Sequence, residues 1–167
     1  MRQNQRASIT GIGSYLPNKV LTNYDLEKMV DTSNDWIIQR TGIKERRIVE
    51  NGVTTSDIAT QASLRAMEDA GVSPKDLDMI ITSTITPDHI FPSTSCYIQQ
   101  KIGATRACAF DILAACAGFI YALSIGQSFI NSGAMKTVLV VGAECLSKIT
   151  DYTDRTTCVL FGDGAGA

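Results

Sequence analysis

The sequence has 167 residues, of which 44% are hydrophobic and 19% charged, and its formal net charge at pH 7 is −2. This length suits one compact α/β domain with a real core, and the composition excludes an intrinsically disordered chain. The small net charge gives no support to a nucleic-acid binder, because no field of one sign dominates the molecule.

No run of about 18 or more apolar residues is present, so no membrane span is predicted. The polar start, Met1 to Arg6, is not followed by the apolar core of a signal peptide, and the expected location is the cytoplasm. The five cysteines are odd in number, form no CxxC pair and are accompanied by a single histidine. A disulfide framework or a metal site is therefore not expected.

Strand and helix patterns alternate along the chain, which is typical of an α/β fold. The expected strands, most of them rich in apolar and β-branched side chains, are residues 8–13, 77–84, 107–112, 137–142 and 157–161. Residues 43–49 are strongly basic and are expected to be extended or irregular. The strand 137–142 should lie in the middle of a covered sheet. Gly162 to Ala167 reads as a tight turn leading into more structure, so we expect the chain to be cut within its fold, with a C-terminal portion missing.

Helices are expected where apolar residues recur at helical spacing between capping residues. The predicted helices are residues 23–30, 33–40, 54–70, 92–102 and 116–132. Asn23 is the expected N-cap of the first helix, and Gly42 and Gly71 end the second and third. The last helix is apolar nearly all round, so most of its surface should be buried.

One cysteine stands where a predicted strand meets the start of this apolar helix. Cys116 follows Ala114 and Ala115 and precedes Ala117 and Gly118. Unpaired N–H groups and the helix dipole favour an anion at such a position, and the thiolate is the reactive form of cysteine. The small neighbours leave room for a substrate carbonyl, and the Cys116 N–H could help to stabilise an oxyanion. On this pattern alone, Cys116 is either a nucleophile or a small apolar residue that fills a crowded helix start.

The other four cysteines lack this setting and are interpreted as structural. They are Cys96 in a helix, Cys108 in a short strand, and Cys145 and Cys158 in or beside strands. A nucleophilic cysteine usually needs a base or a charge partner. His89 lies in a proline-bounded loop and is interpreted as a solvated residue, so we expect the partner to lie in sequence outside this chain.

Two glycine-rich stretches fail as nucleotide-binding motifs. Gly11-Ile12-Gly13 follows a predicted strand, but Leu16 and Pro17 replace the rest of a dinucleotide fingerprint. Gly162 to Gly166 lacks the lysine of a phosphate-binding loop. No nucleotide cofactor is predicted at either stretch.

Several motifs, in this order, resemble those of β-ketoacyl-[acyl-carrier-protein] synthase III. They are Gly13 to Pro17, Asp25 to Ser33, Asp35 to Ile37, Arg40 to Arg46, Phe91 to Ser93, Ala114 to Phe119, Asp154-Arg155 and Phe161 to Ala165. The motif Ala114 to Phe119 is similar to the active-site cysteine motif of that family. The resemblance implies a thiolase-like fold with α-β-α layers, built from two similar halves that each contain a five-stranded mixed sheet. Residues 1–167 would be the first half.

The resemblance implies a decarboxylative Claisen condensation that starts fatty-acid synthesis. Cys116 would accept an acyl group, acetyl being the expected one, from acyl-CoA and release free CoA. Malonyl-[acyl-carrier-protein] would then lose CO2, and its carbanion would attack the thioester. The family's catalytic histidine and asparagine, and a glycine N–H of its oxyanion hole, belong to the second half. Coenzyme A is here part of a substrate, and no cofactor is expected.

Matching positions imply the coenzyme A contacts. Trp36 and Arg155 would sandwich the adenine, which suits an indole face and a planar guanidinium. Thr32 would hydrogen-bond the base, and Arg40 would lie toward the phosphates. Phe91 matches the position that reaches across a homodimer and lines the partner's acyl pocket. Without the resemblance, Trp36 and Phe91 would be interpreted as core residues and the two arginines as solvated charges.

Three alternatives stay open. The basic run Lys44, Arg46 and Arg47 either adds to a positive mouth for anionic substrates or is a solvated face. A related thiolase-fold condensing enzyme of secondary metabolism differs only in its acyl pocket and second half. A non-catalytic half-domain that binds CoA or nothing would leave Cys116 unreactive toward alkylation. No nucleic-acid or membrane partner is expected in any of these cases.

Overall fold

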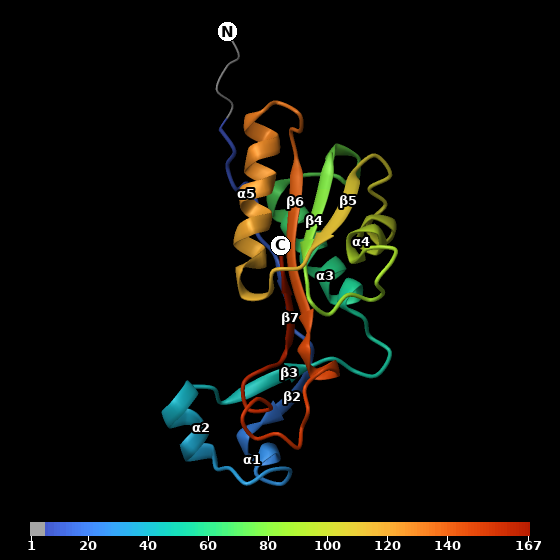
Figure 1. Cartoon of the computed structure of the whole chain (residues 1–167). Coiled ribbons are helices and arrows are strands. Elements are labelled where there is room, and N and C mark those ends of the chain that lie inside the picture. The colour runs from blue at the N-terminus through green and yellow to red at the C-terminus, as the bar shows by residue number, and fades with distance from the viewer. Residues whose placement is uncertain (1–5) are drawn as a thin grey trace.

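Five strands pair into one mixed sheet in the computed structural model, which describes residues 6–167 (Figure 1). In sheet order they are β1 (Ser14–Tyr15), β7 (Asp163–Gly166), β6 (Val138–Cys145), β4 (Met79–Ser83) and β5 (Cys108–Ile112). β4 pairs in parallel with β5 and β6, and β7 pairs antiparallel with β6 and β1. The predicted five-stranded mixed sheet is therefore confirmed, with β6 at its centre. The polar start at residues 1–5 lies outside the described residues.

Helices cover both faces of this sheet. α3 (Thr55–Ala70) and α4 (Thr94–Ile102) lie on one face, and α5 (Gly118–Asn131) lies on the other (Figure 1). Side chains alternate across β4, so Ile80 joins the apolar cluster under α3 and α4, while Met79 and Ile81 pack against Ala122 of α5. The α-β-α layering expected for the fold is confirmed. Among residues 6–167, no helix combines the length and apolarity needed to cross a membrane.

A smaller lobe hangs below the sheet (Figure 1). Its elements are the antiparallel strands β2 (Lys19–Thr22) and β3 (Glu45–Ile48) and the helices α1 (Asn23–Leu26) and α2 (Asn34–Thr41). We call these elements, together with the segment 151–161, the hairpin lobe. It has its own apolar cluster, formed by Leu26, Ile37, Cys158 and Val159. The three 3-10 turns of the described chain are η1 (Pro74–Asp76), η2 (Ala115–Ala117) and η3 (Leu146–Lys148).

Two of the three predicted capping residues, Gly42 and Gly71, are confirmed. Thr54 and Asp57 form a reciprocal capping box at the start of α3, and Gly71 ends that helix with φ 64°. Gly42 ends α2 with φ 73°, as predicted for a left-handed C-cap. The prediction for Asn23 is wrong, because Thr22 is the N-cap of α1 and the Asn23 side chain is fully buried.

The strand predicted at residues 8–13 is wrong, since pairing begins only at β1. Gly11 and Gly13 instead lie directly on the backbone of α3: an added Cβ would come within 2.4 Å of the Ala66 oxygen and 2.3 Å of the Ala62 oxygen, respectively. Gly13 alone reaches a ladder partner, exchanging backbone hydrogen bonds of 2.9 and 2.8 Å with Ala167. Residues 8–12 lack a neighbouring strand within the described chain, and this is why they are not part of the sheet.

The strand predicted at residues 157–161 is also wrong, because this segment consists of turns. Its apolar residues Cys158 and Val159 fill the cluster of the hairpin lobe rather than a sheet. The strand comes next, in the stretch Asp163–Gly166 that was interpreted as a turn. Small residues suit this strand because an added Cβ at Gly164 would lie only 3.1 Å from Leu16.

Asp78 fixes the turn that enters β6. Its carboxylate accepts hydrogen bonds from the N–H groups of Lys136 (2.7 Å) and Thr137 (3.0 Å). These bonds, that from Lys136 first, hold the pKa of Asp78 below its ordinary value of 3.8. Because the folded-state pKa is lowered, the stabilisation is present above the ordinary value and is lost as pH falls through the folded pKa.

Replacing Asp78 with asparagine should therefore lower the free energy of unfolding by about 1 kcal/mol at neutral pH. The difference between variant and parent should be smaller at about pH 3, because the carboxylate of the unfolded chain is then mostly protonated. Urea denaturation at the two pH values measures it. Glu50→Gln, at an exposed position, is the control and should show little effect at either pH. A pH-independent loss in Asp78→Asn would contradict the electrostatic explanation.

Candidate active site

Cys116 lies in the 3-10 turn η2, between β5 and α5. Ala115 has φ 44°, a left-handed backbone conformation that is strained for a residue with a Cβ. Gly118 begins α5, and an added Cβ there would lie 1.9 Å from the hydroxyl oxygen of Ser83 on β4. The helix α5 starts two residues later than predicted, and its first residue packs directly against β4. This sharp turn leaves the Cys116 side chain exposed.

A shallow pocket opens beside Cys116, at the junction of η2 with β6 and β7. Small residues of these strands form much of its lining, Leu16 and Phe119 add apolar walls, and Glu144 is its charged member. The predicted room around the thiol is therefore confirmed. Glycine and alanine residues of β6 and β7 make up most of the strand side of this pocket.

Glu144 was not singled out from the sequence, and its carboxylate is fully engaged. It accepts hydrogen bonds from the Thr86 hydroxyl (2.6 Å), the Ile85 N–H (2.9 Å) and the Thr84 hydroxyl (3.3 Å). It therefore fixes the segment after β4 rather than offering a base to Cys116. Its position in the sequence, as a single charged residue at the end of the apolar stretch 138–143, could have indicated a buried polar role for Glu144.

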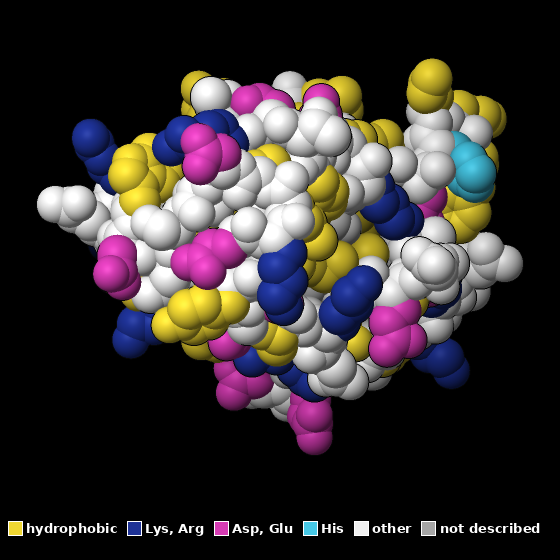
Figure 2. All heavy atoms as spheres, turned by 90° about the horizontal axis from the view of Figure 1, so that it is seen from below, with side chains coloured by type: hydrophobic (Ala, Val, Ile, Leu, Met, Phe, Trp, Pro, Cys, Tyr) yellow, Lys and Arg dark blue, Asp and Glu magenta, His cyan; other side chains and the backbone are white. Residues whose placement is uncertain are grey.

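No side chain among residues 6–167 hydrogen-bonds the Cys116 thiol. His89 is exposed, as predicted, and its ring lies against Tyr97 with ring centroids 5.6 Å apart. In the view of the molecule from below, the histidine sits on a projecting edge (Figure 2). The described part of the chain also holds no cluster of three His, Cys, Asp or Glu side chains suited to a metal ion.

The remaining cysteines have different surroundings. Cys145 and Cys158 are buried, and burial raises the pKa of both thiols. Cys96 is half-buried and accepts a hydrogen bond from the Ser93 hydroxyl at 3.2 Å. Cys108 is exposed on β5. Cys108 and Cys116 are therefore the two exposed thiols, and Cys116 is the one in a pocket at a helix start.

The outer face of α5 is exposed, although the apolar pattern predicts burial. Ile120 and Tyr121 are 61% and 55% exposed. The sheet covers one side of the helix, where Ala122 and Gly126 lie, and no other described element packs on its outer side. An apolar surface therefore adjoins the candidate nucleophile.

Two guanidinium groups flank the ring of Trp36. The Cζ atom of Arg155 lies 5.0 Å from the ring centroid, and that of Arg40 lies 6.0 Å from it. Both distances are in the range of cation–π contacts. Trp36 and Arg40 belong to α2, while Arg155 belongs to the segment 151–161. The fold thus brings together three of the four residues that the resemblance assigned to coenzyme A.

Thr32, the fourth, lies just before α2. Its hydroxyl oxygen is buried and has no hydrogen-bond partner within the described chain. Nearby, Arg155 makes a long ion pair of 3.9 Å with the exposed carboxylate of Asp31. This long, exposed ion pair therefore constrains the Arg155 side chain only weakly.

The underside of the hairpin lobe carries basic and acidic side chains intermixed rather than one basic field (Figure 2). Lys44 is exposed and Arg47 is half-buried, in contact with Glu45 at 3.1 Å. Arg46 fits neither interpretation of the basic run, because it is only 4% exposed. The alternation of side chains along β3 turns Arg46 inward while its two neighbours face outward.

Phe91 lies on a projecting loop between β4 and α4. Ile90 is 100% exposed and Phe91 is 88% exposed, so the interpretation of Phe91 as core is wrong. Asp88 anchors the loop by accepting hydrogen bonds from the N–H (2.8 Å) and the hydroxyl (2.5 Å) of Ser56. Two large apolar side chains are thus held away from the core of this chain.

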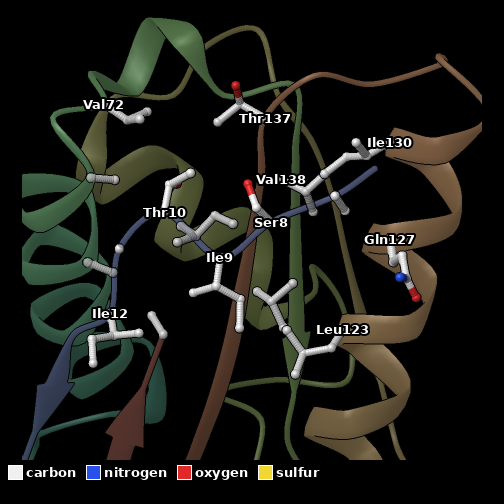
Figure 3. Close-up of a pocket in the computed structure, with 18 of the residues that line it drawn as sticks. Ser8, Ile9, Thr10, Ile12, Val72, Leu123, Gln127, Ile130, Thr137 and Val138 are labelled. Carbon is white, nitrogen blue, oxygen red and sulfur yellow. The ribbon is translucent and has the colours of Figure 1, made fainter. Parts of the chain in front are cut away.

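A larger cavity of about 440 Å³ lies elsewhere, between residues 8–12, α3, α5 and β6 (Figure 3). Figure 3 shows Ile9, Ile12 and Leu123 around this space. The cavity lies in the direction in which β7 points. Gly166 of β7 pairs with Ser14 on one side and Gly142 on the other, and two residues further along these two neighbours stand Ile12 and Val140, which line the cavity. Its lining contains no charged side chain, and we assign it no chemistry.

Comparisons with known proteins show which proteins this chain resembles. Residues 110–167 match the family model for 3-oxoacyl-[acyl-carrier-protein] synthase III. The chain is 63% identical over 161 residues to the β-ketoacyl-[acyl-carrier-protein] synthase III of Caldanaerobacter subterraneus subsp. tengcongensis, covering 96% of this chain and 49% of that protein.

Solved structures give the same result. The 3-oxoacyl-[acyl-carrier-protein] synthase III of Aquifex aeolicus VF5 superposes with a TM-score of 0.93 at 59% identity, covering 95% of this chain and 51% of that one. The priming β-ketosynthase of the R1128 polyketide pathway superposes with a TM-score of 0.94 at 40% identity, covering 99% and 50%. The chain thus spans about half the length of the relatives it matches.

Proposed function

Because the chain belongs to the β-ketoacyl-[acyl-carrier-protein] synthase III family over the part that it spans, we propose that it carries the acyl-accepting half of a condensing enzyme of fatty-acid synthesis. The observation that carries this proposal is the exposed Cys116 thiol, held at a strained turn before α5 and opening into a pocket of small residues. Acyl-CoA donates the acyl group, with acetyl-CoA as the expected donor. Malonyl-[acyl-carrier-protein] is the second substrate.

The chemistry begins at the sulfur. The Cys116 thiolate attacks the thioester carbonyl of acyl-CoA, a bond forms between that sulfur and the acyl carbon, and the CoA thiolate leaves and takes up a proton. Malonyl-[acyl-carrier-protein] then loses CO2, and the resulting carbanion displaces the Cys116 sulfur to give the β-ketoacyl product. The histidine and asparagine that the family uses to stabilise this carbanion would come from the second half.

Coenzyme A would lie across the rim of the hairpin lobe. Adenine stacked on both Trp36 and Arg155 needs about 7 Å between them, since each stacking contact takes about 3.5 Å. The present separation is 5.0 Å, so Arg155 has to swing outward. Its exposed position and its long ion pair with Asp31 allow this movement. Arg40 then faces the phosphates, and Thr32 turns its unpartnered hydroxyl toward the base.

A second copy of the chain is the proposed partner of Phe91. The exposed pair Ile90 and Phe91 is apolar and lies on a loop that Asp88 bonds to Ser56, which suits insertion into the acyl pocket of a homodimer. The cytoplasm is the proposed location, because a reducing compartment keeps an exposed catalytic thiol free.

Incubation of the protein with acetyl-CoA tests the proposal. A mass increase of one acetyl group should appear, and peptide mapping should place it on Cys116 as a hydroxylamine-labile thioester. Acetylation at another residue, or none in the whole protein, would remove the mechanism.

A second candidate function is supported by the 40% identity to the priming β-ketosynthase of the R1128 pathway. Such an enzyme would load the same cysteine with the starter acyl group of a polyketide instead of that of a fatty acid. Competition between acetyl-CoA and longer acyl-CoA donors for Cys116 distinguishes the two, because the acyl pocket sets the preference.

A further inference from the structure

The hairpin lobe contains a buried cation that the proposed chemistry does not use. Arg46 is 4% exposed, and desolvation by burial lowers the pKa of its guanidinium. It has no ion pair with a carboxylate among residues 6–167, although burying an unpaired charge is costly. The groups that hold it are neutral oxygens.

Those oxygens belong to two segments of the lobe. The Nη1 atom of Arg46 donates to the side-chain oxygen of Asn23 at 2.5 Å. Its Nε atom donates to the backbone oxygen of Val159 at 3.1 Å, and Nη2 donates to the same oxygen. Two N–H groups of the planar guanidinium thus converge on the single carbonyl oxygen of Val159, a geometry that the ammonium group of lysine does not reproduce.

Asn23 extends this contact to α2. It is fully buried, and its amide nitrogen donates to the side-chain oxygen of Asn34 at 3.1 Å and to the Ile43 carbonyl at 2.8 Å. Asn34 is the first residue of α2, and Ile43 follows its last turn. One buried amide therefore fixes both ends of the helix that carries Trp36.

The two segments joined by this network carry the two sides of the adenine site. Trp36 is two residues from Asn34, and Arg155 is four residues from Val159. No hydrogen bond joins the side chains of Trp36 and Arg155 directly, and the ion pair of Arg155 with Asp31 is long and exposed. The spacing of the two segments is therefore set by the Arg46–Asn23 network together with the apolar cluster of the hairpin lobe.

We infer that Arg46 and Asn23 are positioning residues for coenzyme A: they hold α2 and the segment 151–161 at the spacing that lets Trp36 and Arg155 receive the adenine. This inference rests on the proposed function, because it concerns the same ligand. Neither residue touches the ligand in this role. This role explains why an arginine is buried here without a carboxylate partner: its guanidinium joins Asn23 to Val159.

Three substitutions separate positioning from general stabilisation. Arg46→Lys keeps the charge but loses the fork on Val159. Asn23→Asp keeps an acceptor for Arg46, and adds an ion pair, but loses the donors to Asn34 and Ile43. Arg47→Lys is the matched control, since Arg47 is the next residue of β3 and contacts Glu45 and the Pro17 carbonyl at the surface.

Isothermal titration of the folded protein with coenzyme A is the primary measurement. We expect the Kd to rise about tenfold in Arg46→Lys and in Asn23→Asp, and to change less than twofold in Arg47→Lys. Acrylamide should quench the fluorescence of Trp36, the single tryptophan, more strongly in the first two variants than in the parent protein. The alkylation rate of Cys116 should stay at its parent value, which shows that the sheet is intact.

Unchanged coenzyme A affinity in both Arg46→Lys and Asn23→Asp would overturn the inference. A reduced affinity accompanied by an equal loss of Cys116 reactivity would also overturn it, because that pattern is general destabilisation. If Arg46→Lys fails to fold, Asn23→Asp still decides the question, since its added ion pair supports the lobe. Trp36→Ala tests the premise separately: undiminished binding in that variant would refute the adenine site itself.

Discussion

Replacing Cys116 with serine is expected to lower the rate of acyl transfer from acetyl-CoA by at least about a thousandfold. A hydroxyl is far less ionised than a thiol near neutral pH, and no described side chain is placed to deprotonate a serine at this position. The fold should be unaffected, because the side chain is exposed and nearly isosteric. Radiolabelled acetyl-CoA and quantification of protein-bound label measure the effect.

Cys108→Ser is the matched control for this experiment. Cys108 is the other exposed thiol, but it lies on β5, away from the start of α5. Acyl transfer in Cys108→Ser should equal that of the parent protein. If loss of Cys108 reduces labelling as much as loss of Cys116, the assignment of the nucleophile is wrong.

Replacing Gly13 with alanine is expected to cost at least about 3 kcal/mol of folding stability. The added Cβ would lie 2.3 Å from the Ala62 oxygen and 2.4 Å from the Ala66 nitrogen, both of which are backbone atoms of α3. Neither atom can move aside without displacing the helix, which packs on β1, β6 and β7. A fall in melting temperature of roughly 6–12 °C, or loss of the folded protein, should follow.

Gly166→Ala provides the comparison within the same strand pair. Here the nearest atom to an added Cβ is the Gly13 oxygen, at an ordinary contact distance of 3.9 Å. Its stability should stay close to that of the parent, because a strand residue gains from losing backbone freedom in the unfolded state. Equal melting temperatures for the Gly13 and Gly166 variants would show that the close packing on α3 is not rigid.

The elements best predicted from the sequence are those with a local cause. α3 has a capping box at one end, a left-handed glycine at the other and a regular apolar spacing between them, and it forms as expected. β4 is buried along its whole length in the sheet and begins with the apolar residues Met79, Ile80 and Ile81. Local hydrogen bonds and side-chain periodicity determine such elements, so neighbouring residues in the sequence suffice to predict them.

The errors occur where a distant partner decides the structure. Residues 8–13 have a strand-like composition, yet most of them lack a neighbouring strand within the described chain. Residues 158 and 159 are apolar because they fill the cluster of the hairpin lobe, and the true strand β7 is made of small residues that a composition rule interprets as a turn. Asn23, a residue type that favours helix starts, is buried instead as a bridge between segments.

The sequence by itself determined the α/β class, most helices and the identity of Cys116 as the candidate nucleophile, because these depend on spacing and residue type within short windows. The tertiary structure alone decided that Arg46 is buried, that Trp36 meets Arg155, and that the outer face of α5 and the side chain of Phe91 are exposed. Arg46 meets Val159 and Trp36 meets Arg155 across more than a hundred positions of the chain, whereas Phe91 and the outer face of α5 are exposed because no described segment packs on them. No local pattern encodes which distant segments will meet.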